Sequence, residues 1–510
     1  LVAGGSLGGV AAALSACRLG QTVIMTEQCR WIGGQLTSQG VSAPDEQPWI
    51  ESFGGTETYC RLRNGIRQYY RLHYPLVSDA RLKSRLNPGN GHVSKVCHEP
   101  RVGLAVIEQM LAPFVSSGQL TILTQHKPVS ATVKGDKVES VSFLDLRDGK
   151  TQTVSAEFVL DATELGDLLP LTGTEYVSGS ESQADTGEPH ALPTADPEIV
   201  QSFTVCFFMD YRPHENWVID KPDEYDHFKK AQPLQWVHPH PVTLQPRKYC
   251  LFDSLDGDGY PLWKYRRVID KTNFEEDCFP SDVCLVNWPH NDFMEGNLID
   301  KDEATQELLI KRAKNLSRSL LYWMQTEAPR PDGGIGYPEL RLRPDMTDTA
   351  DGLCQYPYIR ESRRIKPVFR VTEQHVASAL RPDGKAEVFK DSVGIGLYRI
   401  DLHPASNGNP YIDIGCCPFQ IPLGALIPQR ITNLIPACKN IGTTHITNGS
   451  YRLHPVEWNI GESAGALASF CLQYEVPPQA VREKEQLLKT YQENLTQLGI
   501  TLEWPEVHPI

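Results

Sequence analysis

The sequence predicts an α/β fold in which a parallel-sheet domain is interrupted by an inserted α+β domain with a mixed sheet. Three observations support this prediction. A glycine-rich turn joins a short apolar strand to an alanine-rich helix at the start of the chain, and a second apolar strand follows. A second glycine-containing helical pattern lies near the other end, at residues 454–465. The residues between these segments carry alternating, aromatic-rich stretches that are typical of a second sheet.

The turn after the first strand has the spacing of a dinucleotide-binding βαβ unit, in which the N-terminus of the helix holds a pyrophosphate. Gly4, Ser6 and Gly9 fill the three positions of G-x-G-x-x-G, and a serine replaces the middle glycine. This replacement makes the turn less tight but keeps the site. The alternative is a helix that packs closely on a strand without a ligand. The predicted pyrophosphate-binding residues are Gly4, Gly5, Ser6, Leu7, Gly8 and Gly9.

The second strand ends in an acid, Glu27, close to the expected distance of about 20 residues after the glycines. An acid at this point binds ribose, and it favours a free hydroxyl over a phosphorylated one. Glu27 and its neighbour Gln28 are therefore predicted to bind the cofactor. Only three residues precede the turn, whereas a buried strand usually has about five or six. We therefore expect the natural chain to begin earlier, so that a targeting peptide would lie outside this sequence.

Composition indicates an ordinary globular protein of two or three domains. The chain has 510 residues, of which 40% are hydrophobic and 22% are charged. Its net charge of −14 argues against nucleic acid and anionic membrane surfaces as partners. No apolar run reaches the roughly 18 residues of a membrane span. We expect a cytoplasmic protein.

The thirteen cysteines show no C-x-x-C or zinc-like spacing, so neither a disulfide scaffold nor a metal site is expected. Cys416 and Cys417 are neighbours and are interpreted as buried thiols in an apolar loop. Between Gly34 and Cys60 there is no cysteine, although a redox-active pair follows the first βαβ unit soon in flavin disulfide reductases. The sequence therefore argues against a dithiol reductase.

Periodicity and composition divide the chain into four parts. Residues 1–195 and 396–475 are assigned to the parallel-sheet domain, 196–395 to the inserted substrate domain, and 476–510 to a helical tail. A Pro-, Asp- and Glu-rich stretch at 185–198 marks the first crossing. Helices are predicted at 61–73, 102–114, 304–326 and 480–498. Strands are predicted at 120–124, 138–144, 157–161, 203–208 and 283–288.

Several segments carry a family resemblance: the glycine turn, Trp31-Ile32-Gly33-Gly34-Gln35-Leu36-Thr37, and residues 97–101, 358–365 and 440–465. Together they resemble the FAD-dependent oxidoreductase family. The resemblance implies a Rossmann-like FAD-binding domain of the glutathione-reductase type. It also implies one FAD lying extended across the parallel sheet, and no second glycine-rich unit for NAD(P) is recognisable. The likeness extends over nearly the whole chain and indicates cofactor and fold rather than reaction.

The resemblance also implies where the cofactor lies. Its adenosine would be near Glu27, and its flavin ring near the 33–35 loop and the closing helix. Asn459 to Ser463 are expected to open that helix and to direct its N–H groups and positive dipole end at the N1/C2 edge of the flavin. The strand that ends at Asp161 would return to the nucleotide sheet; the alternative is an ordinary strand followed by an Asp-capped helix. The further predicted cofactor-binding residues are Gly33, Gly34, Gln35, Asp161, Ala162, Thr163, Asn440, Asn459, Ile460, Gly461 and Glu462.

Flavin oxidations remove a hydride from an alcohol or amine carbon and commonly need a base. His454, His445, His403 and His98 are candidate bases, and each has the alternative of a hydrogen-bonded packing residue. An arginine could clamp an anionic group, and its alternative is an ion-paired or solvated face. Arg360, Arg363, Arg364 and Arg399 are the arginines considered for this role. The residues chosen as catalytic candidates are His454, His445, Arg399 and Arg364.

The expected function is that of an FAD-dependent dehydrogenase or oxidase. It would pass a hydride to flavin N5 from a small polar, possibly anionic metabolite. A flavin-dependent monooxygenase shares the fold and is the first alternative. A protein that binds FAD without chemistry of its own is the second. Covalent flavin attachment through histidine or cysteine stays open.

Overall fold

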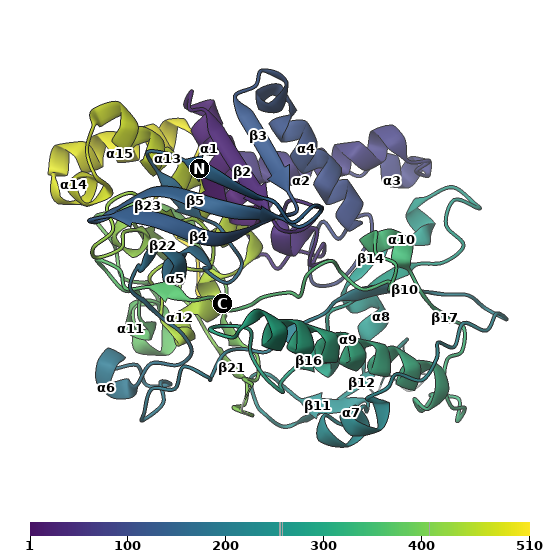
Figure 1. Cartoon of the computed structure of the whole chain (residues 1–510). Coiled ribbons are helices and arrows are strands. Elements are labelled where there is room, and N and C mark those ends of the chain that lie inside the picture. The colour runs from purple at the N-terminus through teal and green to yellow at the C-terminus, as the bar shows by residue number, and fades with distance from the viewer. Residues whose placement is uncertain (254–256, 258, 407) are drawn as a thin grey trace.

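The computed structural model describes residues 1–253, 257, 259–406 and 408–510 (Figure 1). Its first layer is a parallel sheet in the order β23-β7-β1-β2-β3. All four neighbouring pairs in this sheet are parallel, which confirms the α/β prediction. The strands are β1 (Val2–Ala3), β2 (Val23–Glu27), β3 (Leu120–Thr124), β7 (Val159–Asp161) and β23 (Leu434–Pro436).

Two glycine-containing helices pack against each other beside this sheet, α1 (Leu7–Arg18) and α13 (His454–Tyr474). A Cβ atom on Gly461 would overlap the carbonyl oxygen of Gly8, and one on Gly465 would overlap that of Ala12. Glycine is therefore required at both positions because the helix backbones touch. The first helix of the chain and residues 454–474 thus meet at this crossing.

The structure corrects the predicted start of the closing helix. The sequence suggested a beginning near Ile460, but α13 begins at His454. Leu453 has extended backbone, and Pro455 occupies the first turn, where its missing N–H costs nothing. Asn459 to Glu462 therefore lie inside the helix and do not present free N–H groups at its N-terminus.

The other long helices confirm the predicted pattern: α2 (Glu57–His73), α4 (Pro100–Ser116) and α9 (Glu303–Thr326). The tail differs from its prediction, because the single helix expected at 480–498 is two helices, α14 (Pro478–Glu483) and α15 (Glu485–Gln497). Lys484 between them has extended backbone, with φ −97° and ψ 108°, which interrupts the helical hydrogen bonds. Among the described residues, no helix is long and apolar enough to cross a membrane.

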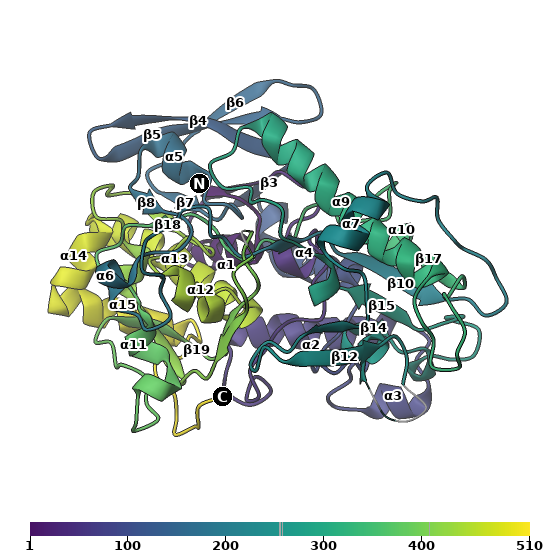
Figure 2. The ribbon, with the colours of Figure 1, turned by 90° about the horizontal axis from the view of Figure 1, so that it is seen from below.

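The middle of the chain forms a second body with its own hydrophobic core, seen in teal and green in Figures 1 and 2. Its larger sheet, β14-β15-β10-β17, is antiparallel throughout, and mixed pairing occurs in the smaller sheet β11-β12-β13. Helix α9 contributes the buried Leu316, Leu320 and Met324 to this core. The strands are β10 (Phe207–Tyr211), β11 (Val237–Pro239), β12 (Pro246–Cys250), β13 (Tyr260–Pro261), β14 (Arg267–Ile269), β15 (Val283–Val286) and β17 (Leu340–Leu342).

The remaining elements are a meander, four two-stranded pairs and several short helices. A three-stranded meander consists of β4 (His126–Lys134), β5 (Lys137–Asp145) and β6 (Thr151–Ser155). Two-stranded pairs consist of β8 (Tyr176–Val177) with β18 (Arg364–Ile365), β9 (Phe203–Thr204) with β16 (Asp292–Phe293), β19 (Ser392–Gly396) with β22 (Phe419–Pro422), and β20 (Ile400–Leu402) with β21 (Ile412–Ile414). The short helices are α3 (Ser78–Leu82), α5 (Leu168–Thr172), α6 (Gln183–Thr186), α7 (Tyr225–Ala231), α8 (Leu262–Tyr265), α10 (Pro344–Thr347), α11 (Glu373–Val376) and α12 (His445–Tyr451).

Candidate functional site

Two N–H groups of the glycine turn donate hydrogen bonds to side chains, one in α13 and one in the turn itself. The N–H of Gly8 donates to Glu457 Oε1 (3.0 Å), and that of Gly9 donates to Ser6 Oγ (3.1 Å). Ser6 is therefore the N-cap of α1, which gives the serine in the middle of the motif a structural role. Gly4 has φ 95°, a conformation that favours glycine.

Glu27 lies beside this turn at the end of β2, as the sequence predicted. Its Oε2 accepts from the Gly5 N–H (2.9 Å) and its Oε1 from the Cys29 N–H (2.7 Å). Burial disfavours the charged form and raises the pKa of Glu27 to about 7, despite these two hydrogen bonds. The carboxyl is therefore close to its midpoint at neutral pH.

The turn also contains polar atoms that suit a dinucleotide. Among the described residues, none accepts a hydrogen bond from the N–H of Ser6 or Leu7, which open α1. On the facing side, the buried Gln35 Oε1 and Glu164 Oε1 have no hydrogen-bond partner. Free N–H groups at a helix N-terminus bind phosphate oxygens, and free acceptor oxygens bind hydroxyl groups. The residues present therefore fit a cofactor that carries both phosphates and sugar hydroxyls.

A buried charge cluster connects four segments in front of the turn. Lys439 Nζ lies 2.6 Å from Glu164 Oε2 and 3.0 Å from Glu457 Oε2, and Gln35 Nε2 donates to Glu457 Oε2 (2.6 Å). Burial opposes ionisation of Glu457, but the Lys439 ammonium outweighs it and lowers its pKa. Of these residues, Gln35 was predicted from the sequence and the three charged ones were not, because no local motif contains them.

The other predicted cofactor residues divide into two groups. Asp161, at the end of β7, accepts from the Thr163 N–H (3.0 Å), and Asn440 Nδ2 donates to the Asp161 carbonyl (3.0 Å). This group lies at the carboxyl ends of the parallel strands, beside the glycine turn. By contrast, Asn459 Oδ1 accepts from the Ile395 N–H of β19 (3.1 Å), and the Glu462 carboxyl contacts Thr58 of α2.

The histidines chosen from the sequence are held within the protein. His454 Nδ1 accepts from the Asp45 N–H (3.1 Å), so its other nitrogen, Nε2, donates to the Val41 carbonyl (3.0 Å). Burial lowers the pKa of His454 to about 4, and both ring nitrogens are already used. His445 Nδ1 contacts the Glu361 carboxylate (2.9 Å), which also binds Arg364 (2.5 Å). Neither His445, Arg364 nor His454 lines the cavity described next.

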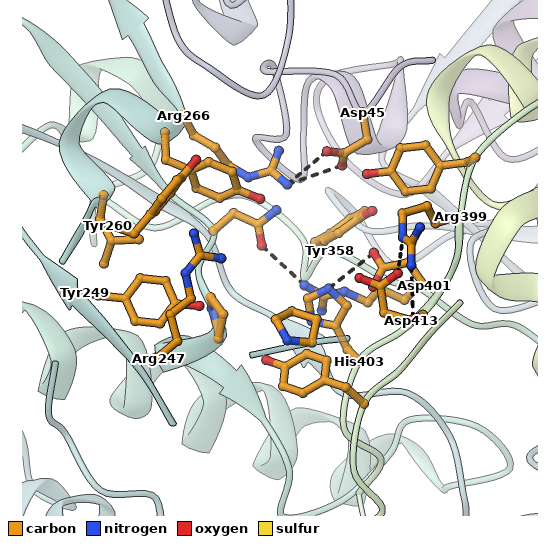
Figure 3. Close-up of a pocket in the computed structure, with 18 of the residues that line it drawn as sticks. Asp45, Arg247, Tyr249, Tyr260, Arg266, Tyr358, Arg399, Asp401, His403 and Asp413 are labelled. Carbon is orange, nitrogen blue, oxygen red and sulfur yellow. Dashed lines mark hydrogen bonds and ion pairs between the residues drawn. The ribbon is translucent and has the colours of Figure 1, made fainter. Parts of the chain in front are cut away.

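A cavity of about 240 Å³ opens between the two bodies (Figure 3). Its wall contains five arginines, six tyrosines, three aspartates and one histidine, contributed by segments from residue 45 to residue 452. Arg399 is the member of the predicted catalytic set that reaches it. The lining residues are Asp45, Pro241, Arg247, Tyr249, Tyr260, Leu262, Tyr265, Arg266, Asn287, Pro289, Tyr358, Arg360, Tyr398, Arg399, Asp401, His403, Tyr411, Asp413 and Arg452.

Four of the five arginines have a carboxylate partner. The partner of Arg360 is Asp292, behind the wall. The remaining pairs are Arg266 with Asp45 (3.1 Å), Arg452 with Asp401 (3.3 Å), and Arg399 with Asp413.

Arg247 differs from the other four. Within the described residues, no salt bridge involves its guanidinium, which stands 4.3 Å from the ring centroid of Tyr260 and 5.3 Å from that of Tyr249. Figure 3 shows this side chain beside the two tyrosine rings. The cavity therefore contains one cation that no carboxylate of the described residues neutralises.

Arg452 connects the cavity with the buried charge cluster around Lys439. Arg452 lines the cavity just before α13, and its NH1 donates to Tyr358 Oη (2.9 Å). Its backbone carbonyl accepts from Gln35 Nε2 (3.2 Å), whose side chain also reaches Glu457. The cavity therefore lies near Gln35, and the family resemblance implies that the flavin ring is bound near this residue.

Residues 1–495 match the sequence profile of the family described as FAD dependent oxidoreductase. The chain belongs to this family. It is an FAD-dependent oxidoreductase, and FAD is its cofactor. The recognition made from the glycine turn and the distal segments is thereby confirmed. A comparison with the curated proteins finds no match.

Solved structures that resemble parts of the chain are distant. An L-proline dehydrogenase from P. horikoshii is 14% identical, with 35% of this chain and 22% of that one covered and a TM-score of 0.18. The glycerol-3-phosphate dehydrogenase from Bacillus halodurans, complexed with FAD, is 15% identical, with 41% and 39% covered and a TM-score of 0.22. CabE, an aromatic hydroxylase from angucycline biosynthesis, is 16% identical, with 44% and 37% covered and a TM-score of 0.24. The matches thus span between 22% and 39% of those three chains.

Proposed function

We propose that this FAD-dependent oxidoreductase removes a hydride from an alcohol or amine carbon of a small anionic metabolite bound in the 240 Å³ cavity. When bound, FAD supplies the hydride acceptor at its N5 atom. The observation that carries the proposal is the position of the cavity. It adjoins α13 and the Gln35 loop, and its wall has more arginines than aspartates.

Arg247 is the proposed anchor for the anionic group of the substrate. A guanidinium forms paired hydrogen bonds with carboxylate and phosphate oxygens, and here no carboxylate of the described chain competes. The two tyrosine rings that it touches hold its plane in place, which reduces the entropy lost on binding. The paired Arg266, Arg399 and Arg452 are proposed to shape the wall.

The assignment of the two bodies follows from this proposal. Residues 196–395 would form the substrate side, because they contribute Arg247, Tyr249 and Tyr260 to the cavity. Residues 1–195 and 396–475 would hold the FAD in an arrangement of the glutathione-reductase type. Ser6 and Leu7 are proposed to donate their N–H groups to the pyrophosphate, with Glu27 accepting from the ribose.

The proposal is tested with the purified, FAD-loaded protein under anaerobic conditions. A panel of hydroxy acids, amino acids, sugar acids and sugar phosphates is mixed with it, and flavin bleaching is followed by absorbance. We expect at least one anionic member to bleach the flavin, and its uncharged analogue to do so much less. Bleaching by NADH or NADPH alone, with no response to any panel member, would contradict the proposal and favour a monooxygenase.

Arg247→Gln tests the anchor. Loss of a hydrogen bond to a charged group costs about 1.5–3 kcal/mol, so the concentration of substrate for half-maximal reduction should rise roughly 10- to 100-fold. The matched control is Arg330→Gln, because Arg330 also stands over a tyrosine ring, that of Tyr337 at 5.1 Å, but does not line the cavity. An unchanged half-maximal concentration in Arg247→Gln would remove Arg247 from the site.

A further inference from the structure

His403 is the one histidine in the cavity wall, and a buried acid holds one side of its ring. Its Nδ1 lies 2.5 Å from Asp292 Oδ2. The Asp292 side chain is 1% exposed, whereas that of His403 is 18% exposed. One ring nitrogen therefore faces the interior, and the other belongs to the half of the ring that borders the cavity.

The Asp292 side chain makes two further contacts. Its Oδ1 accepts from Thr204 Oγ1 (2.5 Å) and lies 3.0 Å from Arg360 NH2. Arg360 is anchored in turn through NH1 to the Ser202 carbonyl (2.8 Å). Burial opposes ionisation of Asp292, but Arg360 and His403 outweigh it and lower its pKa to about 2. The acid is therefore a permanent anion that accepts from Nδ1–H.

An ionised partner on Nδ1 determines the tautomer of the ring. With the proton on Nδ1, Nε2 carries a lone pair and can accept a proton. Nε2 lies 3.9 Å from Asp401 Oδ2, beyond hydrogen-bond distance, and Asp401 is already paired with Arg452. Among the described residues, none donates a hydrogen bond to Nε2.

We propose that His403 is the proton acceptor of the oxidation and that Asp292 is the residue that positions it. The inference rests on the proposed function, because it assumes that the cavity binds the substrate. The substrate hydroxyl or ammonium proton moves to His403 Nε2. The C–H hydrogen leaves with its electron pair as hydride to FAD, the oxidant, and the carbon–oxygen or carbon–nitrogen bond becomes double. The balance is one proton on His403 and two electrons on the oxidant.

The other candidate bases lack this arrangement. His454 uses both nitrogens on backbone groups, and His445 is held by Glu361 outside the cavity. His98 is fully buried, contacts the Val96 carbonyl through Nδ1 and also lies outside the cavity wall. Around His403, the charged and titratable groups are Asp292 from β16, Asp401 from β20, Arg360, and Tyr411, whose ring centroid is 5.6 Å away. Of these, the two acids carry the charge opposite to that of a protonated ring.

The first test needs no substrate. Long-range ¹H–¹⁵N spectra of the FAD-loaded protein, with His403 assigned by the His403→Gln variant, report the tautomer. We expect Nδ1–H with an unprotonated Nε2 in the wild type, and loss of this preference in Asp292→Asn. An Nε2–H tautomer in the wild type would overturn the inference whatever the substrate is.

The second test uses the panel compound that bleaches the wild-type flavin. General-base catalysis contributes typically 10²- to 10⁴-fold, so His403→Gln should slow flavin reduction at least 100-fold. Its FAD content and substrate dissociation constant should stay at wild-type values. The wild-type rate should rise with pH to a plateau, and this rise should disappear in His403→Gln. Asp292→Asn should slow reduction less and shift the pH midpoint.

The control is His190→Gln, because His190 also pairs with an acid, Glu373 (2.6 Å), but its side chain is 43% exposed and lies outside the cavity. Its rate and pH profile should match the wild type. Reduction of His403→Gln at the wild-type rate would overturn the inference while the proposed function stands. A panel in which nothing bleaches the wild type would count against the proposed function, and the tautomer would still decide whether His403 can act as a base.

Discussion

The pKa values of buried carboxyl groups are shifted in opposite directions on the two sides of the site. On the glycine-turn side, burial raises the pKa of Glu27 and Asp161 to about 7, and it does the same to Glu462, which lies farther along α13 against α2. On the cavity side, burial also opposes ionisation, but nearby cations outweigh it and lower the pKa of Asp292 and Glu361 to about 2. All of these groups are buried carboxyl groups. They differ in whether cationic side chains lie close to them.

The difference in pKa indicates which kinds of chemical group each side can bind. Carboxyl groups without a cation are about half-protonated at pH 7 and act as hydrogen-bond partners for hydroxyl groups. Carboxyl groups paired with arginine stay ionised and fix the positions of the guanidinium groups. The cavity side therefore presents ordered positive charge, whereas the glycine-turn side presents polar groups with one ammonium, Lys439.

Lys439→Met should give the largest effect, because it removes that ammonium. Glu164 and Glu457 would remain buried without a cation, and breaking a buried pair costs about 3–5 kcal/mol. We expect a fall of this size in the free energy of unfolding, measured by urea denaturation, or a failure to fold.

Two further variants make the Lys439 result decisive. Lys439→Met with Glu164→Gln should recover part of the loss, because one unpaired charge is removed. Lys366→Met is the control, since Lys366 is exposed and should change stability by less than about 0.5 kcal/mol. A stable single variant would show that the cluster is not ionised, and the contrast between the two sides would then lose its exception.

Glu462→Gln should sharpen the comparison through pH. The folded pKa of about 7 lies above the ordinary value of 4.5, so protonated Glu462 stabilises the fold at low pH. This stability is fully present below about pH 4.5 and is lost as the pH rises through 7. Because one pKa unit corresponds to 1.36 kcal/mol, the loss is on the order of 3 kcal/mol.

A glutamine at this position stays neutral, so the variant should be more stable than the wild type at pH 8 and similar at pH 5. The measurement is the thermal midpoint at both pH values. Glu139→Gln serves as the control, because Glu139 is exposed on β5. An equal pH response in wild type and Glu462→Gln would place the titrating group elsewhere.

The features that the sequence predicted are those encoded locally. The strand, turn and helix around Gly4 to Gly9, Glu27 at the end of β2, and the amphipathic α4 and α9 all follow from patterns within about 20 residues. The start of α13 was missed although a signal was present, since Pro455 is typical of a first helical turn. The secondary structure around the glycine turn was thus accessible from local patterns, and the cofactor-binding role of its residues stays a prediction.

The cavity could not be predicted in the same way. Asp292 and His403 are separated by 111 residues, and Arg360, which fixes Asp292, comes from a third segment. The acids that hold these groups give no signal of their own, because a lone Asp or His in a sequence has many roles. Arg399 was chosen for its charge, yet the unpaired cation of the described wall is Arg247, which only the tertiary arrangement distinguishes.

Glu27→Gln should give the smallest of these effects, on FAD binding rather than on folding. Both Glu27 oxygens already accept backbone N–H groups, so glutamine keeps the size but has one acceptor oxygen fewer. A hydrogen bond to a charged group is worth about 1.5–3 kcal/mol, so FAD should bind roughly 10- to 100-fold more weakly. Because the pKa of Glu27 is about 7, wild-type affinity for FAD should rise between pH 6 and pH 8 as the carboxylate forms, and the variant should lack this rise.

Titration of FAD into the apoprotein at both pH values measures the affinity of wild type and Glu27→Gln, with Glu139→Gln as control. Equal affinities that share one pH dependence would mean that Glu27 does not contact the ribose, and that its role is confined to bracing Gly5 and Cys29.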